Sequence, residues 1–384
     1  MTRSRISFAN AVARLGLYVL WALGLAGCAQ GGGTLGYYWQ SLSGHVHLMQ
    51  AARPLDDWIA APGTAPDLRD RLELARRARA FAVQELHLPD NASYHRYADL
   101  GRSSAVWNVV AAPPFSLKLH TWCFPVVGCV GYRGYFAQQD AKAEASRLAN
   151  EGLEVNVYGV PAYSTLGAMN WAGGDPLLNT FVRWPEGDFV RLLFHELAHQ
   201  KVYAKGDTLF NESFASAVGA LGSQAWLRTQ ADDAARAAFA AAEEQRQGFR
   251  ALVRSTRENL ATIYEQKDLP GHDGQALAAM KTEAMAQFHQ RYQELSASWI
   301  ISTAQRAGYD AWVRRANNAS FAAQAAYDEW VPAFEALFAQ CAGQWPQFYQ
   351  AVQTLADDAP ETRQARMRAL LPSPNPTAKE PLCG

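Results

Sequence analysis

The sequence predicts an α+β fold that is mostly helical, in which a pair of helices carrying metal-ligand side chains lies under a small sheet and precedes a long helical hairpin. Three observations lead to this prediction. Apolar residues have helical spacing around His195 and His199, short alternating segments occur between 105 and 158, and alanine-rich charged segments follow Gly222. The 384 residues, 49% of them hydrophobic and 18% charged, are typical of a globular chain with one large or two modest domains.

Residues 1–27 have the features of a lipoprotein signal peptide. Arg3, Arg5 and Arg14 make the segment basic, and its apolar run, 15–25, is too short to span a bilayer. The run ends in Leu-Ala-Gly-Cys, which resembles a bacterial lipobox and would make Cys28 the lipidated first residue of the mature chain. Residues 28–35 then form a glycine-rich, flexible tether. An uncleaved anchor or an ordinary secretory signal is the alternative.

The signal peptide and the lipobox predict a protein of the bacterial cell envelope, anchored by its lipid at the periplasmic face of a membrane. Ala29 after the cysteine resembles the lipoproteins that are sorted to the outer membrane. A formal net charge of −1 gives no reason to expect a nucleic-acid partner. We expect a monomer.

Four cysteines remain when Cys28 is set aside. In an oxidising compartment an even number predicts two disulfides, for which three connectivities exist. Cys123 and Cys129 flank a turn-capable segment, which favours their pairing and leaves Cys341 to pair with Cys383. A zinc site made by cysteines is the alternative, although the spacing of 123 and 129 is poor for it.

The region 36–228 is predicted to hold the N-terminal helices, the sheet and the metal site. Apolar spacing indicates helices from 37 to 88, interrupted at Pro54, and we expect the five arginines between 69 and 79 on a solvated helix face. A strand-like segment at 105–112 ends at Pro113-Pro114, alternation predicts strands at 116–122 and 153–158, and 129–136 is predicted to be a further strand or loop of the same sheet. A short helix is expected over 138–150.

The segment 194–200 carries the strongest chemical signal, His-Glu-x-x-His within an apolar helical pattern. Residues four apart share one face of a helix, so the imidazoles of His195 and His199 can bind one metal ion. Glu196 lies beside them, where it can take a proton from a metal-bound water. The alternative to a metal site is two histidines in the core and a solvated glutamate.

Glu212 is the predicted third ligand. The zinc helix should end near Lys205-Gly206, and Asp207 or Thr208 can cap a following helix that holds Glu212 in its first turns. Two helices joined by so short a turn must pack together. Two histidines and one glutamate would leave the fourth position of one Zn²⁺ per chain open for water, as in catalytic zinc sites.

Together, His195-Glu196-x-x-His199 and the segment Asn-Glu-Ser-Phe-Ala at 211–215 resemble the gluzincin group of zinc peptidases. More closely, the chain resembles a bacterial lipoprotein family labelled as aminopeptidases. The likeness is strong from Gly36 to about Leu227 and includes Gly-Tyr-Tyr-Trp-Gln at 36–40, Trp-Cys-Phe-Pro at 122–125 and Ala-Tyr-Ser-Thr-Leu-Gly at 162–167. It implies a zincin-like fold and zinc-dependent hydrolysis of peptide bonds, with aminopeptidase activity as the family expectation.

In zincins the substrate pairs with an edge strand above the zinc helix, and 157–178 is our candidate for that edge. Tyr163 on this edge is the chosen donor to the oxyanion, ahead of Tyr158 and Tyr203. An aminopeptidase also needs a carboxylate for the substrate amine, and spacing does not choose among Glu154, Asp175 and Asp188. The candidates for orienting the imidazoles are Asp207, Asn211 and Ser216.

The region 229–384 is predicted to be helical. Residues 231–266 and 275–307 should form an antiparallel hairpin, followed by helices near 321–339 and 346–355 and a polar, proline-bearing tail. We expect His272 and His289 to be surface or packing residues. This half of the chain should pack on the catalytic region and form one wall of its cleft.

Two rival functions remain open. The chain could be a non-catalytic envelope lipoprotein in which zinc stabilises a domain that binds a partner. It could also use the same metal to hydrolyse an amide of the cell wall.

Overall fold

A computed structural model describes residues 34–124, 128–165, 167, 170–266, 274–372 and 382–383 of the chain. It is 64% helical with small sheets, which confirms the α+β, mostly helical class. The predicted signal peptide, Cys28 and most of the tether lie outside the described residues, as does His272. No helix within the described ranges combines the length and apolar character needed to cross a membrane.

The N-terminal part holds three helices, α2 (Thr34–Ala51), α3 (Leu55–Ala60) and α4 (Pro66–Gln84). The strands β1 (Arg53–Pro54), β2 (Arg96–Ala98) and β8 (Leu177–Leu178) form a small sheet beside them. The solvated face expected for the arginines of α4 is wrong for Arg79, which is 2% exposed. Its guanidinium donates hydrogen bonds to the carbonyl groups of Pro89, Asn91 and Ser93, so it closes the loop that follows the helix.

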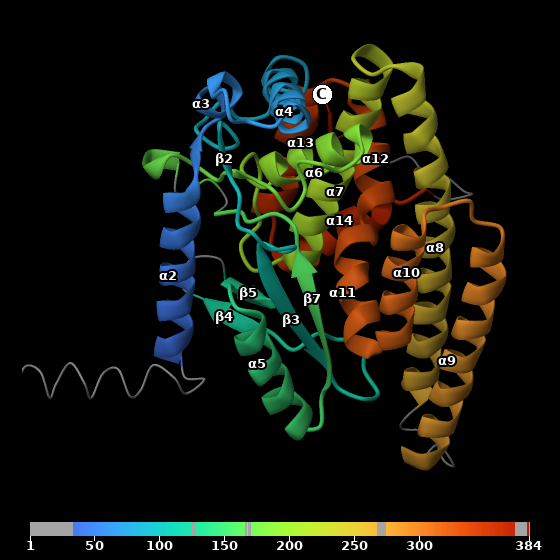
Figure 1. Ribbon diagram of the computed structural model, residues 1–384. Helices are drawn as coiled ribbons and strands as arrows, with labels where there is room; N and C mark the ends of the chain where they lie inside the picture. Colours follow the sequence, from blue (N-terminus) through green and yellow to red (C-terminus); the bar gives the residue numbers. More distant parts are fainter. Residues whose placement is uncertain are drawn as a thin grey trace, which may run out of the picture.

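The central sheet has the strand order β6-β3-β7, with β3 (Val106–Ala112) paired antiparallel to both β6 (Arg133–Tyr135) and β7 (Glu154–Val160). Its two faces follow the period of two along β3. Val109 and Ala111 pack on α5 (Gln138–Asn150), whereas Val110 and Ala112 pack on α11 (Asn318–Asp328). The sheet is therefore covered by a helix on each side, as Figure 1 shows.

The strand predicted over 116–122 is wrong. Only its last residue lies in a strand, β4 (Trp122–Phe124), which pairs with β5 (Gly128–Val130) as a separate hairpin. The alternation has another cause, because Phe115 and Leu117 contact the helical-hairpin core while Leu119 contacts the sheet and α11. Residues 116–121 therefore connect two cores and belong to no strand.

The C-terminal half is built from helices. The predicted hairpin is present as α8 (Asp233–Glu265) and α9 (Gly274–Ala297), but its second helix ends at Ala297 and not near 307, because Ser302 caps a new helix, α10 (Thr303–Arg315). Helix α10 packs along the hairpin, where Trp312 contacts Phe249 of α8 and Phe288 of α9 (Figure 1). The single helix expected over 321–339 is two, α11 and α12 (Val331–Gln340), because Pro332 lacks the N–H needed to continue a helix. They are followed by α13 (Trp345–Asp357).

The tail holds a helix that the sequence reasoning missed, α14 (Pro360–Leu370). Its buried residues Arg363, Met367 and Leu370 lie at spacings of three and four, but the polar composition of the segment hides that stripe.

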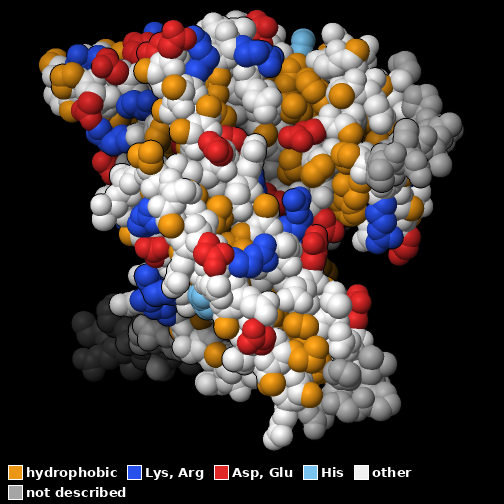
Figure 2. All heavy atoms as spheres, turned by 90° about the vertical axis from the view of Figure 1, so that its right-hand side faces the viewer, with side chains coloured by type: hydrophobic (Ala, Val, Ile, Leu, Met, Phe, Trp, Pro, Cys, Tyr) orange, Lys and Arg blue, Asp and Glu red, His pale blue; other side chains and the backbone are white. Residues whose placement is uncertain are grey.

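Basic and acidic side chains are interspersed on the face shown in Figure 2.

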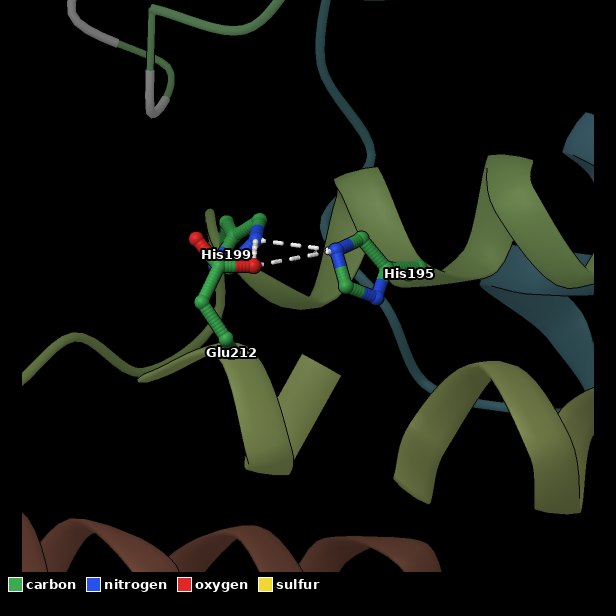
Figure 3. A group of neighbouring side chains, drawn as sticks. All are labelled: His195, His199 and Glu212. Atoms are coloured by element: carbon green, nitrogen blue, oxygen red, sulfur yellow. Dashed lines mark hydrogen bonds and ion pairs between the residues drawn. The ribbon is translucent and has the colours of Figure 1, made fainter. Parts of the chain in front are cut away.

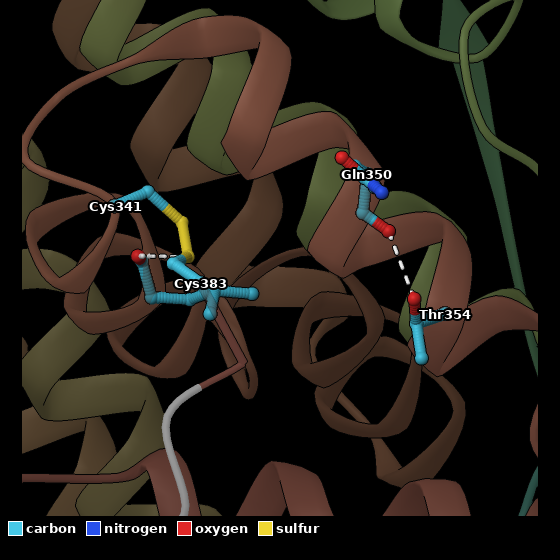
Figure 4. The surroundings of a disulfide bond; sticks show 5 residues. Cys341, Gln350, Thr354 and Cys383 are labelled. Carbon is cyan, nitrogen blue, oxygen red and sulfur yellow. Dashed lines mark hydrogen bonds between the residues drawn. A yellow bond between two sulfur atoms is a disulfide. The ribbon is translucent and has the colours of Figure 1, made fainter.

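Both predicted disulfides are present. Cys123 and Cys129 face each other across the β4–β5 hairpin. Cys341 at the end of α12 binds Cys383, which attaches the end of the chain to the helical half (Figure 4).

Candidate metal centre

Helix α6 (Glu186–Ala198) carries the His-Glu-x-x-His segment. It begins after Pro185, and Glu186 and Asp188 lie in its first turn, where negative charge favours the positive end of the helix dipole. His195 and His199 are one turn apart, so their side chains leave the same face of the helix.

A fixed turn connects α6 to α7 (Thr208–Thr229). Asp207 caps α7 by accepting a hydrogen bond from the Phe210 backbone N–H at 3.0 Å. The Asn211 side chain binds both backbone groups of Ala204, at 2.8 and 2.7 Å, so it holds the turn and does not orient an imidazole. Gly128 of the disulfide hairpin approaches the backbone of Gly206 so closely that a side chain there would collide.

The three predicted ligands come together, as Figure 3 shows. The Nε2 atoms of His195 and His199 are 3.2 Å apart, and each is 3.5 Å from Oε2 of Glu212. All three side chains thus present one ligand atom to a common point, and this group could hold a metal ion.

These spacings suit zinc. Zn–N and Zn–O bonds of about 2.0–2.2 Å at tetrahedral angles place ligand atoms roughly 3.3–3.5 Å apart. Histidine ligands generally donate their second N–H to a partner, but Nδ1 of His199 is buried and has no partner within the described part of the chain. The donor set fits zinc, and the support expected behind His199 is missing.

The electrostatics favour a charged Glu212 beside a less acidic Glu196. Burial opposes ionisation of Glu212, but the two imidazoles lower its pKa to about 2. Burial raises the pKa of Glu196, which suits a group that accepts a proton and passes it on.

A cavity of about 940 Å³ opens above the triad. Its lining includes Val106 and Asn108, which share the β3 face of Val110 and Ala112, and the facing Tyr158 of β7. The walls hold apolar, aromatic and a few charged side chains, typical of a ligand-binding site.

Tyrosines surround the metal position. The Tyr327 ring, from α11, stacks on His195 with ring centroids 6.2 Å apart. Burial raises the pKa of Tyr327 and of Tyr132, and the nearby Glu212 carboxylate raises it further. Sequence reasoning missed both residues, because only long-range packing brings them to the site.

The family of the chain follows from a comparison with known proteins. The profile of a family described as "Putative aminopeptidase" matches residues 36–367. The chain belongs to this family. No curated protein and no solved structure matches the chain. The match extends well beyond Leu227, so the putative aminopeptidase family includes the helical half that supplies Tyr327.

Tyr163 lies on the wall of the same cavity. Its role as the donor to the oxyanion stays a prediction. Its hydroxyl is 3.2 Å from Nδ1 of His45 on α2. Burial raises the pKa of Tyr163, and the nearby Asp175 carboxylate raises it further. Ser216 also lines the cavity. The proposed substrate edge includes the end of β7, at the free edge of the central sheet, followed by a loop.

The three candidate amine-binding carboxylates have different surroundings. Glu154 binds Lys281 and the backbone of Asn318. Asp175 is buried and accepts hydrogen bonds from the backbone and hydroxyl of Thr165. Asp188 is the one of the three that lines the cavity, where it pairs with Arg246 at 2.6 Å.

Proposed function

We propose that the chain is a zinc-dependent peptidase of the cell envelope, with aminopeptidase activity as its family description suggests. The observation that carries the proposal is the convergence of His195, His199 and Glu212 at the floor of a cavity large enough for a peptide. The short turn between α6 and α7 and the edge position of β7 support a zincin-like, gluzincin-type arrangement.

Zn²⁺ bound by these three residues would polarise the scissile carbonyl and make a water molecule acidic. Glu196 would take a proton from the attacking water and deliver it to the leaving amine. Tyr327, stacked on His195, and Tyr163, on the cavity wall, are the candidates for donating a hydrogen bond to the oxygen that gains negative charge.

Hydrolysis by the Glu196→Gln variant tests this proposal. We expect the zinc-loaded protein to release N-terminal amino acids from mixed peptides, measured by mass spectrometry, and the variant to be at least about 100-fold slower while keeping its zinc. Cleavage of muropeptides but not of peptides would favour a cell-wall amidase. Zinc binding without any hydrolysis would leave the non-catalytic lipoprotein.

We also propose that the chain is anchored to a bilayer, in keeping with the lipobox at Cys28, and that α2 lies on the lipid surface. Among the described residues, seven large hydrophobic side chains are exposed, and four of them lie on α2: Tyr38, Trp39, Leu42 and Val46. Residues 29–33 separate Cys28 from Thr34, so α2 would begin within roughly 20 Å of the lipid. Tyrosine and tryptophan favour the membrane interface.

Fatty-acid labelling tests the anchor, and vesicle flotation tests the surface. Cys28→Ser should abolish incorporation of a labelled fatty acid into the protein. For the surface, the soluble form beginning at Ala29 should float with vesicles of phosphatidylethanolamine and phosphatidylglycerol, and Trp39→Ser with Leu42→Ser should abolish flotation. Equal flotation of the double variant would contradict contact between α2 and lipid.

A further inference from the structure

One wall of the cavity is charged. Asp188 and Arg191 lie on α6 one to two turns before His195, and Arg246 reaches the same wall from α8. The β4–β5 hairpin lies beyond the other end of α6, where its Gly128 approaches Gly206. There the lining includes the aromatic pair Tyr37 and Phe124. The metal position therefore lies between a charged end and an aromatic end.

Arginines outnumber the carboxylates that pair with them directly at the charged end. Glu243 accepts from Arg191 at 2.6 Å, from Arg246 at 3.0 Å and also from Arg250. Asp188 accepts from Arg246 alone in this group. Three guanidinium groups thus share two directly paired carboxylates, and two of the three, Arg191 and Arg246, line the cavity. Asp328 and Glu335 also lie near Arg191 and Arg250, but burial raises the pKa of both carboxyl groups and so disfavours their charged forms.

Part of each cavity arginine stays accessible. The side chains of Arg191 and Arg246 are 20% and 24% exposed, and both line the cavity. Nε and Nη1 of Arg246 bind Glu243 and Asp188, whereas its Nη2 is buried and therefore closed to a ligand. A substrate carboxylate could meet the accessible part of these side chains, whereas a substrate amine seeking Asp188 would have to compete with Arg246.

The spacing along α6 sets the distance from the metal position. At 1.5 Å per residue, Arg191 and Asp188 lie roughly 6 and 10 Å before His195. An extended peptide advances about 3.3 Å per residue, so this span corresponds to two or three residues of substrate.

We propose that the wall formed by Arg191 and Arg246 binds a carboxylate of the peptide substrate, two or three residues from the bond that is cut. This inference rests on the proposed peptidase function and names its substrate class, peptides with an acidic group near the cleavage site. The carboxylate can be a side chain or the C-terminus of a short peptide.

Paired peptides test the inference. One series carries Glu or Gln at each position within three residues of the cut bond, and a second has a free or an amidated C-terminus. At one position the zinc-loaded enzyme should prefer the acidic member at least about tenfold in kcat/KM, mainly through KM. The series that shows the preference identifies the source of the carboxylate.

Arg246→Gln should remove the preference, and Arg246→Lys should restore part of it because the positive charge remains. Arg250→Gln is the matched control, because Arg250 binds the same Glu243 but does not line the cavity. Thermal unfolding of each variant separates a folding defect from a lost contact. A preference that survives in folded Arg246→Gln, or acidic and neutral peptides cut within twofold of each other by the unmodified enzyme, would overturn the inference.

Failure of the peptidase proposal itself has a different signature, namely that no peptide of either series is cut. Calorimetric binding of the same peptides to the zinc-loaded Glu196→Gln protein then decides the matter independently of hydrolysis. Tighter binding of the acidic members would support the carboxylate site, and equal binding would refute it.

Discussion

Gly219 offers a direct test of how the metal centre is built. It lies on α7 two turns after Glu212, where α7 packs against α6. A Cβ atom at Gly219 would be 2.7 Å from the Arg191 carbonyl oxygen and 3.3 Å from Cβ of His195. Ordinary contacts begin near 3.4 Å, so Gly219→Ala must separate the helices by roughly 0.7 Å.

This movement should weaken metal binding more than it weakens the fold. Alanine gains about 1 kcal/mol over glycine inside a helix, whereas overpacking costs about 1–3 kcal/mol, so the net loss of unfolding free energy should be about 1 kcal/mol. Metal–ligand distances tolerate only about 0.2 Å, so we expect the zinc affinity to fall at least about tenfold.

Gly308→Ala is the matched control, because Gly308 lies inside α10 with no atom within 4 Å of the new Cβ. It should stabilise the protein by up to about 1 kcal/mol and leave zinc binding unchanged. Competition with a chelating dye measures the affinity, and urea unfolding measures the stability. If Gly219→Ala matched Gly308→Ala in both assays, close approach of the two helices would not be what positions Glu212.

Three further predictions concern stability and the oxyanion donor. Burial opposes ionisation of Glu243, but its arginine neighbours lower its pKa to about 2. The stabilising charge of Glu243 is therefore present above pH 5 and lost towards pH 2. The unfolding free energy of the unmodified protein should exceed that of Glu243→Gln by about 1–2 kcal/mol after solvent screening, and pH-dependent unfolding should show this difference shrinking over that range. Cys341→Ser with Cys383→Ser opens a loop whose ends are 42 residues apart and should destabilise the oxidised protein by about 3–4 kcal/mol in denaturant unfolding, whereas an unchanged midpoint would mean that the bond does not constrain the unfolded chain. Tyr327→Phe should lower kcat at least about tenfold with little change in KM, and Tyr163→Phe should do the same only if Tyr163, not Tyr327, is the donor.

Local periodicity accounts for what the sequence predicted well. His195 and His199 follow from helical spacing, and the short turn with a capping Asp207 brings Glu212 to them. The strands predicted at 105–112 and 153–158 are likewise present, as β3 and β7. In each case the signal lies within about twenty residues.

Long-range packing accounts for the rest. Tyr327 and Arg246 reach the cavity from the helical half, more than fifty residues after His195, and no local pattern marks them. The mistaken strand at 116–122 has the same origin, since its alternation reflects contacts with two separate cores. Arg79 shows that a charged residue within an apolar stripe can be buried when backbone carbonyls surround its guanidinium.

Metal content tests the central claim most directly. We would measure zinc by mass spectrometry in the soluble form beginning at Ala29, in His199→Ala and Glu212→Gln, and in a control, His289→Ala, which alters a histidine on α9 beside the Val313 carbonyl. We expect about one zinc per chain in the unmodified protein and the control, and loss of zinc in the other two. Absence of tightly bound metal from the unmodified protein, after zinc has been offered, would contradict the account.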